Sequence, residues 1–194
     1  MHNIMKKEQR QENILLSLKK LDYLSRSQLQ KLHRLGSDRN ATRVMKDMSE
    51  YVSSFRHVEN VYYLNKAGRE RVRATKICRG RTPQITHYLM RNSMYISLGC
   101  PITWKNEIKL KVKDVQIVAD AHFEEKDTIH IVEVDHTQKM SENRKKIEKY
   151  REIVRLTGLK FQFHWITITH NRQKQLLELC QGLNVNVSLA QDYI

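Results

Sequence analysis

Hydrophobic residues in the first fifty positions recur at helical spacing in three successive segments. The first segment covers residues 10–24, and a second helix is predicted after Ser25, which with Gln28 fits a capping box. Gly36 is expected to end that helix in the left-handed conformation, and Ser37 to cap a third helix. The apolar stripe of the third helix consists of Ala41, Val44, Met45, Met48 and Val52. Short helices joined by a tight turn are typical of a helix-turn-helix.

A hairpin and a further helix are predicted next. Apolar residues at 55–58 and 61–64 flank two polar positions and indicate two short strands, which would form a wing. Asn65 is a favourable N-cap for the helix that follows. The stretch 79–83 contains Gly and Pro and is interpreted as a linker. The pattern therefore predicts a winged helix-turn-helix domain over residues 1–80.

The remaining chain alternates strands with helices. The expected elements are a helix at 84–97, strands at 102–110, 115–123 and 128–135, a helix at 141–157, a strand at 161–168, a helix at 171–182 and a strand at 185–187. This order predicts an α/β domain over residues 81–194. Together with the helical N-terminal domain, it makes the chain an α+β protein.

The chain of 194 residues has a formal net charge of +14, which is unevenly distributed. Residues 1–81 hold 19 lysines and arginines against 8 acidic residues, a net of +11, whereas residues 82–194 hold 16 against 13, a net of +3. Cations concentrated in one small domain indicate a polyanion-binding protein, although a basic surface that only aids solubility has the same composition. The 3 cysteines form no CxxC pair, which argues against a disulfide framework or a cysteine-rich zinc module.

No apolar run has the length of a membrane span, so we expect a cytoplasmic protein, associated with nucleoid DNA and not with a membrane.

The third predicted helix is expected to enter the major groove of DNA, because its apolar stripe faces the core and its other face is polar and basic. Arginine and asparagine form paired hydrogen bonds with guanine and adenine edges. Cations elsewhere in the domain would contact phosphates. The candidate DNA-binding residues are Arg39, Asn40, Thr42, Arg43 and Lys46 on this helix, Arg56 and His57 on the wing, and Arg26 and Lys31 on the second helix.

Three carboxylates are expected on one face of the second domain. A tight turn centred on Lys126 and Asp127 would join two predicted strands and place Asp120 opposite Glu133. Asp135 shares that face because side chains alternate along a strand. Carboxylates so close repel one another unless a divalent cation or nearby lysines neutralise them. The arrangement predicts a metal-dependent nuclease or a domain related to one.

Segments in both halves of the chain resemble one protein family. They are Leu24-Ser-Arg-Ser-Gln-Leu-Gln-Lys-Leu32, Arg39-Asn-Ala-Thr-Arg-Val-Met-Lys46 and Tyr63-Leu-Asn-Lys-Ala-Gly-Arg69, followed by His87-Tyr-Leu-Met-Arg-Asn92, Asp120-Ala-His-Phe123, Ile131-Val-Glu-Val-Asp135 and Lys146-Ile-Glu-Lys-Tyr150. In this order they resemble the replication-relaxation proteins of plasmids and other mobile elements of Gram-positive bacteria. The resemblance covers about residues 10–170. It implies a role in plasmid replication, in control of DNA topology, or in regulation on a mobile element.

The second domain also resembles the PD-(D/E)XK nuclease fold, in which a hairpin presents an Asp and then a Glu-x-Lys. By this resemblance Asp120 and Glu133 correspond to the metal-binding acids, and Glu107 on the preceding strand could supply another carboxylate. The chain departs from the pattern at two positions, because Asp135 replaces the lysine and Ala119 replaces the proline. A lysine from the next helix would have to substitute. For an active nuclease the candidate residues are Glu107, Asp120, Glu133, Asp135, Lys146 and Lys149, with Asp120 and Glu133 holding Mg²⁺ or Mn²⁺.

Because that lysine is missing, we expect the second domain to be inactive and to serve in dimerisation or partner binding. Our interpretation is a sequence-specific protein that binds double-stranded DNA without a cofactor. It would act as a homodimer in replication control, DNA relaxation or transcriptional regulation on a plasmid, phage or other mobile element. A replication or conjugation protein is a further candidate partner. The alternative is a metal-dependent endonuclease that nicks or cuts DNA.

Overall fold

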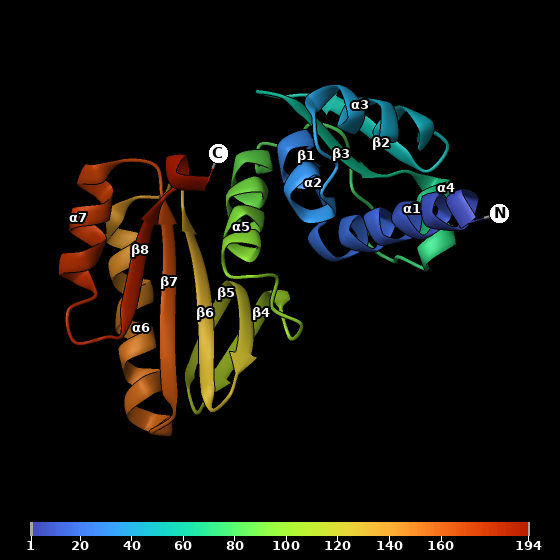
Figure 1. Cartoon of the computed structure of the whole chain (residues 1–194). Coiled ribbons are helices and arrows are strands. Elements are labelled where there is room, and N and C mark those ends of the chain that lie inside the picture. Colours follow the sequence, from blue (N-terminus) through green and yellow to red (C-terminus); the bar gives the residue numbers. More distant parts are fainter. Residues whose placement is uncertain (1, 194) are drawn as a thin grey trace. The chain divides into compact units, whose positions relative to one another are not determined.

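The chain divides between Asn92 and Ser93 into two compact units, shown in Figure 1. The computed structural model describes residues 2–193. It contains helices and two separate sheets, which agrees with the predicted α+β class. Within the described residues, no helix is both long enough and apolar enough to cross a membrane.

The first unit combines helices with a small antiparallel sheet. Its elements in chain order are α1 (His2–Leu21), β1 (Leu24–Ser25), α2 (Arg26–His33), α3 (Asp38–Asp47), β2 (Val52–Arg56), β3 (Asn60–Leu64), α4 (Lys66–Val72) and the first part of α5 (Ile85–Ser97). The strand order is β1-β3-β2, and both pairings are antiparallel. Three helices and a hairpin thus occur where the sequence predicts them, and β1 adds a third strand to the hairpin.

The helix ends of this unit are fixed by side-chain caps. The Ser25 hydroxyl accepts a hydrogen bond from Gln28 N–H, and the Gln28 side chain accepts one from Ser25 N–H, which confirms the predicted capping box. Ser37 caps α3 as predicted. The predicted role of Gly36 is wrong, because α2 ends at Arg34, whose φ of 50° is already left-handed. Gly36, with a φ of 69°, instead belongs to the turn that leads to α3.

The boundary between the units lies beyond the predicted one at residues 80 and 81, because the first part of α5 packs on the first unit. Arg91 is 1% exposed and donates hydrogen bonds to the Asp22 carboxylate at 3.2 Å and to the Leu21 carbonyl at 3.1 Å. The Asn92 amide donates to the carbonyls of Leu21 and Tyr23. A boundary at residue 80 would leave the buried Asp22 with Lys76 as its ion-pair partner and without the buried Arg91.

The second unit is a five-stranded mixed sheet with helices on it. Its elements are the last residues of α5, β4 (Lys105–Val112), β5 (Val115–Glu125), β6 (Thr128–Asp135), α6 (Met140–Thr157), β7 (Lys160–Thr167), α7 (His170–Leu179), β8 (Val185–Leu189) and the 3₁₀ turn η1 (Ala190–Tyr193). The strand order is β4-β5-β6-β7-β8, antiparallel from β4 to β6 and parallel from β6 to β8. The order of helices and strands agrees with the prediction. Strand β4 begins three residues later than predicted, because Ile102 lies in a turn and is 95% exposed.

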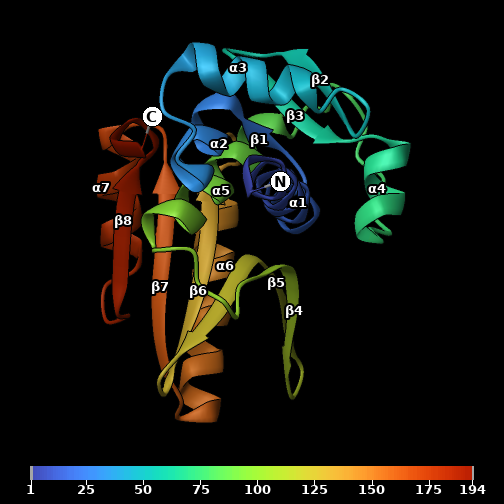
Figure 2. The ribbon, with the colours of Figure 1, turned by 45° about the vertical axis from the view of Figure 1, so that its right-hand side comes forward.

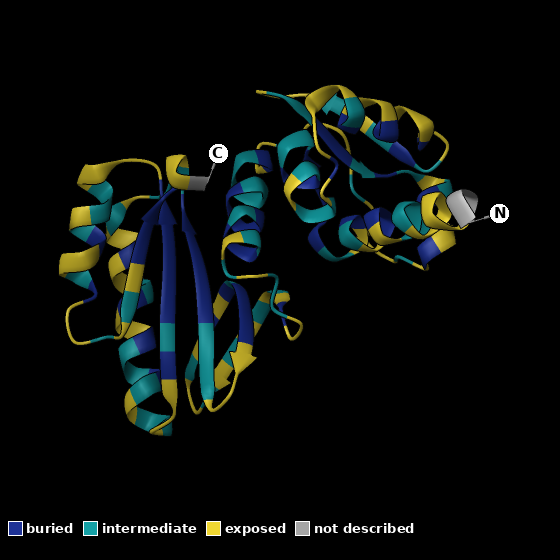
Figure 3. Ribbon diagram, viewed as in Figure 1, coloured by how far each residue is buried: buried dark blue, intermediate teal, exposed yellow. Residues whose placement is uncertain are grey.

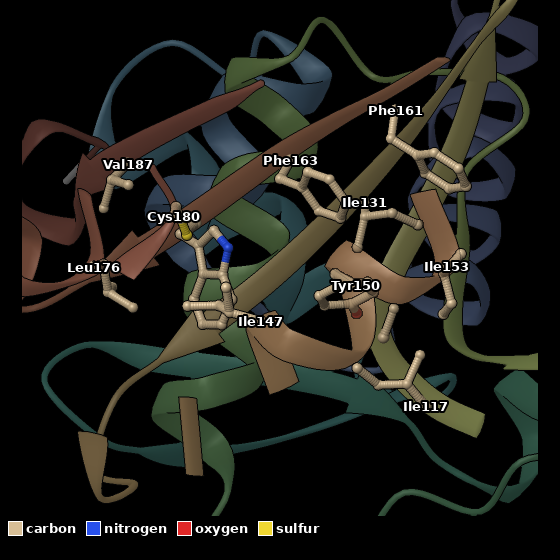
Figure 4. Packing of buried hydrophobic residues seen from close by; sticks show 12 residues of the cluster. Ile117, Ile131, Ile147, Tyr150, Ile153, Phe161, Phe163, Leu176, Cys180 and Val187 are labelled. Atoms are coloured by element: carbon tan, nitrogen blue, oxygen red, sulfur yellow. The ribbon is translucent and has the colours of Figure 1, made fainter. Parts of the chain in front are cut away.

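Helices α6 and α7 connect the parallel strands and cover one face of the sheet, as Figures 1 and 2 show. Figure 4 shows the apolar cluster between them and the strands, with Tyr150, Phe163 and Leu176 among its members. Strands β6 and β7 are buried along most of their length (Figure 3), as expected for parallel strands in the middle of a sheet. Two polar side chains of β6 are also buried, Glu133 and Asp135, and both require partners.

The end of α2 gives a direct stability test. A Cβ atom in the left-handed region is unfavourable, so Arg34→Gly should raise the free energy of unfolding by about 0.5–1 kcal/mol. Arg34→Ala is the matched control, because it removes the same side chain and keeps the Cβ atom. Urea unfolding followed by circular dichroism measures both variants. Equal urea midpoints for Arg34→Gly and Arg34→Ala would show that the gain in stability does not come from the left-handed backbone.

Candidate DNA-binding helix and carboxylate site

Helix α3 presents a basic face opposite a buried one. Four residues of its predicted apolar stripe are confirmed as core, since Ala41, Val44, Met45 and Met48 are all 5% exposed or less. The fifth, Val52, was wrongly placed on this helix, because α3 ends at Asp47 and Val52 begins β2. The residues between the four core residues point outward. Among the predicted DNA-binding residues, Arg39, Thr42, Arg43 and Lys46 are exposed on this face. The spacing that buries the stripe therefore also gathers three cations and a hydroxyl on one accessible surface.

Asn40, predicted to read a base, has a local role. Its side-chain N–H donates to the Leu35 carbonyl at 2.6 Å, and its Oδ1 accepts from the Arg43 guanidinium at 2.8 Å. The amide thus links the turn before α3 to the helix and orients Arg43. Arg43 is the better placed of the two to meet DNA, because it is exposed while Asn40 is half-buried.

The hairpin of β2 and β3 is attached to the start of α2. The Glu59 carboxylate accepts hydrogen bonds from the backbone N–H and the hydroxyl of Ser27, at the positive end of that helix. Arg26, predicted to contact DNA, pairs with Asp38 at 2.7 Å and with Glu59 at 3.3 Å. These contacts hold α2, α3 and the hairpin together, and a DNA contact by Arg26 stays a prediction.

Other predicted contact residues are exposed. Arg56 and His57 lie at the hairpin tip, where the neighbouring Val58 is 82% exposed. The His57 ring lies 3.3 Å from the Thr86 hydroxyl. Lys31 is exposed on α2. The tip and α3 therefore both offer cations to solvent.

The second candidate site is centred on Glu133 in β6. This side chain is 1% exposed, and its two oxygens accept hydrogen bonds from the Lys146 ammonium and from the Tyr150 hydroxyl. Lys146 and Tyr150 are four residues apart on α6, which places them on the same face of the helix. Burial, and after it the nearby Asp120 carboxylate, raise the pKa of Glu133, while Lys146 and Tyr150 lower it; together they leave this pKa at about 8.

Asp120 reaches this site as predicted. The turn at Lys126 and Asp127 sets the register of β5 and β6, in which Ala121 faces Val132. The next position along brings Asp120 beside Glu133, and the Asp120 carboxylate accepts a hydrogen bond from Val134 N–H at 2.7 Å. Although burial lowers the pKa of Lys146, the carboxylates of Glu133 and Asp120 outweigh it and raise that pKa.

A local distortion of the sheet accompanies this arrangement. On β5, Ala119 packs in the cluster under α6, whereas Phe123 stacks on Trp104 at 5.9 Å, outside that cluster. The regular alternation of β5 is therefore interrupted near Asp120. On the neighbouring strand β4 the corresponding position is Glu107, with a left-handed φ of 52°. Irregularities of this kind redirect side chains in sheets and are common beside active sites.

Asp135 does not belong to the carboxylate site. It is fully buried, and its carboxylate receives two hydrogen bonds from Arg172, at 2.6 and 2.7 Å, and one each from Thr167 and Asn143. Although burial raises its pKa, these donors lower it below the ordinary value. The predicted role of Asp135 as a metal ligand is therefore not supported, because its oxygens are already engaged. Asp135 attaches α7 to the sheet through its hydrogen bonds with Arg172.

Two further predicted residues, Lys149 and Glu107, are exposed. Lys149 is exposed and donates to the Gln116 carbonyl at 3.2 Å, so only Lys146 reaches Glu133. Glu107 is exposed on β4. The sequence reasoning missed Tyr150 as a partner of Glu133, although its spacing of four from Lys146 was a usable signal.

The donor set offers two carboxylates, Asp120 and Glu133, for a metal ion. Within the described residues no group of three or more His, Cys, Asp or Glu side chains is placed to hold one. Mg²⁺ can be bound through one or two carboxylates plus waters, so Asp120 and Glu133 are ligands of the type that this ion prefers. Both oxygens of Glu133, however, are already bound, by the Tyr150 hydroxyl and the Lys146 ammonium. A metal would have to share the site with this ammonium.

The raised pKa of Glu133 predicts a pH dependence of stability. Between the ordinary carboxyl pKa of 4.5 and about 8 the unfolded chain has lost a proton that the folded chain retains. Stability should therefore fall as pH rises through this window, by at most roughly 1.4 kcal/mol per pH unit. Glu133→Gln should flatten that dependence. Urea unfolding at several pH values tests it, with Glu124→Gln at an exposed position as control. Parallel pH profiles for wild type and Glu133→Gln would contradict it.

Comparison with known proteins identifies the family. A family model described as replication-relaxation matches residues 15–164. No curated protein matches the chain. Among solved structures, the crystal structure of protein VC1899 from Vibrio cholerae is similar, with 12% identity and a TM-score of 0.41. That match covers 96% of this chain and 49% of the other, so this chain spans about half the length of VC1899. Because the family model covers well over half of the 194 residues, the chain belongs to the replication-relaxation family.

Proposed function

We propose that the protein binds double-stranded DNA sequence-specifically through its first unit, which acts as a winged helix-turn-helix. The observation that carries the proposal is the division of α3, with four apolar residues in the core and Arg39, Thr42, Arg43 and Lys46 exposed on the other side. In a helix-turn-helix this face enters the major groove, and arginines read guanine there. The net charge of +11 in residues 1–81 supports the same partner.

In this proposal the hairpin of β2 and β3 is the wing. Glu59 attaches it to α2, and Arg56 and His57 at its tip are available for phosphates or the minor groove. Family membership suggests that this binding serves replication or relaxation of a plasmid or other mobile element. We further propose that the protein binds as a homodimer, with the second unit as the platform for dimerisation or for a replication or conjugation protein.

A second candidate function is metal-dependent DNA cleavage in the second unit. It is favoured by one observation, the contact of Lys146 with Glu133 beside Asp120. In this function Asp120 and Glu133 would hold Mg²⁺ or Mn²⁺, which activates water when bound. Lys146 would then turn to a DNA phosphate. We rank it second because both oxygens of Glu133 are already bound, by Lys146 and Tyr150, and because Asp135 is committed to Arg172.

Selection from a random duplex library tests the DNA-reading helix. The full chain should enrich one motif, made of two inverted half-sites about 10 base pairs apart for a dimer. Arg43→Ala should lose about 1–3 kcal/mol of preference at one base position if Arg43 reads it, and Arg39→Ala should act similarly. Lys66→Ala is the control, since it removes an exposed cation from the start of α4. An unchanged motif in both arginine variants would show that α3 does not read the DNA sequence.

A plasmid-nicking assay separates the two functions. With Mg²⁺ or Mn²⁺ the wild type should leave supercoiled plasmid intact, and Asp120→Asn should keep the wild-type affinity for duplex DNA. Asp114→Asn, in the exposed turn between β4 and β5, is the matched control. Metal-dependent nicking by the wild type and Asp114→Asn that disappears in Asp120→Asn and Glu133→Gln would establish the nuclease instead.

A further inference from the structure

The segment between α4 and α5, residues 74–83, is an extended chain that we call the basic strap. The sequence interpretation made part of it a linker because of its Gly and Pro. It carries the cations Lys76, Arg79 and Arg81 within six residues. In the structure it has no helix or strand, yet its backbone is attached to the first unit at several points. It is therefore a fixed part of that unit and not a free connection.

Tyr23 holds the centre of the basic strap. Its hydroxyl donates to the Arg79 carbonyl at 2.8 Å and accepts from the Arg79 N–H at 3.1 Å, so both backbone polar groups of one residue are bound to one side chain. Next to it, Gly80 lies on the aromatic face of the hairpin. A Cβ atom at Gly80 would be 3.1 Å from the Tyr63 hydroxyl and 4.0 Å from the Phe55 ring. The strap thus packs flat against β2 and β3 at this point.

The two arginines on either side of Gly80 are accessible to solvent. Arg79 and Arg81 are both exposed, and within the described residues neither forms an ion pair. Lys76 differs, because it pairs with the buried Asp22 at 2.9 Å. Arg26 and Arg71 in the same unit are also paired with acids. Arg79 is therefore held in place through its backbone, Arg81 follows the packed Gly80, and both keep their charges available.

Their position is beside the hairpin tip. Phe55, which Gly80 approaches, is followed directly by Arg56. Beyond the strap, Thr86 contacts His57 at the tip itself. Arg79 and Arg81, on either side of Gly80, therefore lie on the face of the hairpin that carries Phe55, one residue before Arg56 at the tip. A basic surface that only aids solubility requires no fixed backbone, whereas a surface that fits a regular array of phosphates gains from one.

We propose that the basic strap is a second contact with the DNA backbone, in which Arg79 and Arg81 bind phosphates next to those met by the wing. The proposal rests on the proposed function, since it extends the same interface. Arginine suits this role because its planar guanidinium donates to phosphate oxygens in pairs. The contact is to phosphate and carries no sequence information. It would lengthen the footprint on the wing side of each half-site.

Salt dependence of binding measures such contacts directly. The probe is a 30-base-pair duplex of random sequence, a length set by design at about three helical turns. Its affinity for the full chain is followed by fluorescence anisotropy over a range of salt concentrations. Each phosphate contact contributes about 0.9 to the slope of log affinity against log salt, so Arg79→Ala with Arg81→Ala should reduce the slope by about 1.8. The variant with Lys at both positions should keep most of the slope. Lys66→Ala with Arg69→Ala, on α4, removes the same charge elsewhere and should change it little.

A double-mutant cycle tests the positioning role of Tyr23. Tyr23→Phe removes only the hydroxyl that binds Arg79, so it should weaken duplex binding in the wild-type background. In the background of Arg79→Ala with Arg81→Ala it should have no further effect, because the side chains it positions are gone. Any loss of stability from Tyr23→Phe is common to both backgrounds and cancels in the cycle.

The outcomes separate this proposal from the proposed function. If the wild type does not bind duplex DNA, both are overturned. If the wild type binds with a slope that Arg39→Ala with Arg43→Ala reduces, while the strap variant keeps the full slope, the strap proposal alone is overturned. A reduced slope in the strap variant, with an unchanged slope in the α4 variant and coupling to Tyr23, supports it.

Discussion

Two buried carboxylates on one strand determine how the second unit is assembled. Glu133 and Asp135 lie two residues apart on β6, and each needs polar partners because a buried carboxyl group left without them is costly. The main partners come from two different helices, Lys146 from α6 and Arg172 from α7. Each pair therefore fixes one helix against the sheet, both along its axis and in rotation. Apolar packing alone would leave that register less well defined, since it has no direction.

The first unit also pairs its acids with cations, but it contains more cations than acids. Asp22 is satisfied by Arg91, and Glu59 by Arg26 and the start of α2. The acids of this unit are few, so most of its cations have no acid to pair with. Several of the exposed cations are found on α3, at the hairpin tip and on the basic strap. The structural ion pairs thus decide which cations are left for a polyanion, and composition alone could not make that distinction.

Much of the fold follows from local sequence signals. Ser25, Ser37 and Asn65 cap helices where the sequence predicts them, because a cap depends only on neighbouring residues. The facing of Asp120 and Glu133 was also predictable, since a two-residue turn fixes the register of a hairpin. The end of α2 was not, because a left-handed Arg34 is less favourable than the Gly two residues later and is imposed by packing.

The candidate sites were harder to predict than the elements. In the sequence, Asp135 has the position expected for a third acid of the carboxylate site. Only the tertiary structure brings Arg172, 37 positions later in the chain, into contact with it. Lys146 and Lys149 are equivalent in sequence, and the helix rotation decides that Lys146 meets Glu133. Only the tertiary structure shows that Arg26 pairs with Asp38 and Glu59. Long-range pairing of charges is the information that a single sequence lacks.

The irregular backbone at Glu107 has a consequence for the behaviour of the protein in concentrated solution. Strand β4 is at the edge of its sheet, and an extended edge strand can pair with the edge of another molecule. A left-handed residue in the middle of β4 interrupts the regular row of N–H and C=O groups that such pairing requires. The exposed Lys109 and Lys111 on the same strand would also repel a second copy. The distortion that accompanies Asp120 near Glu133 thus also protects the chain against aggregation through its open edge.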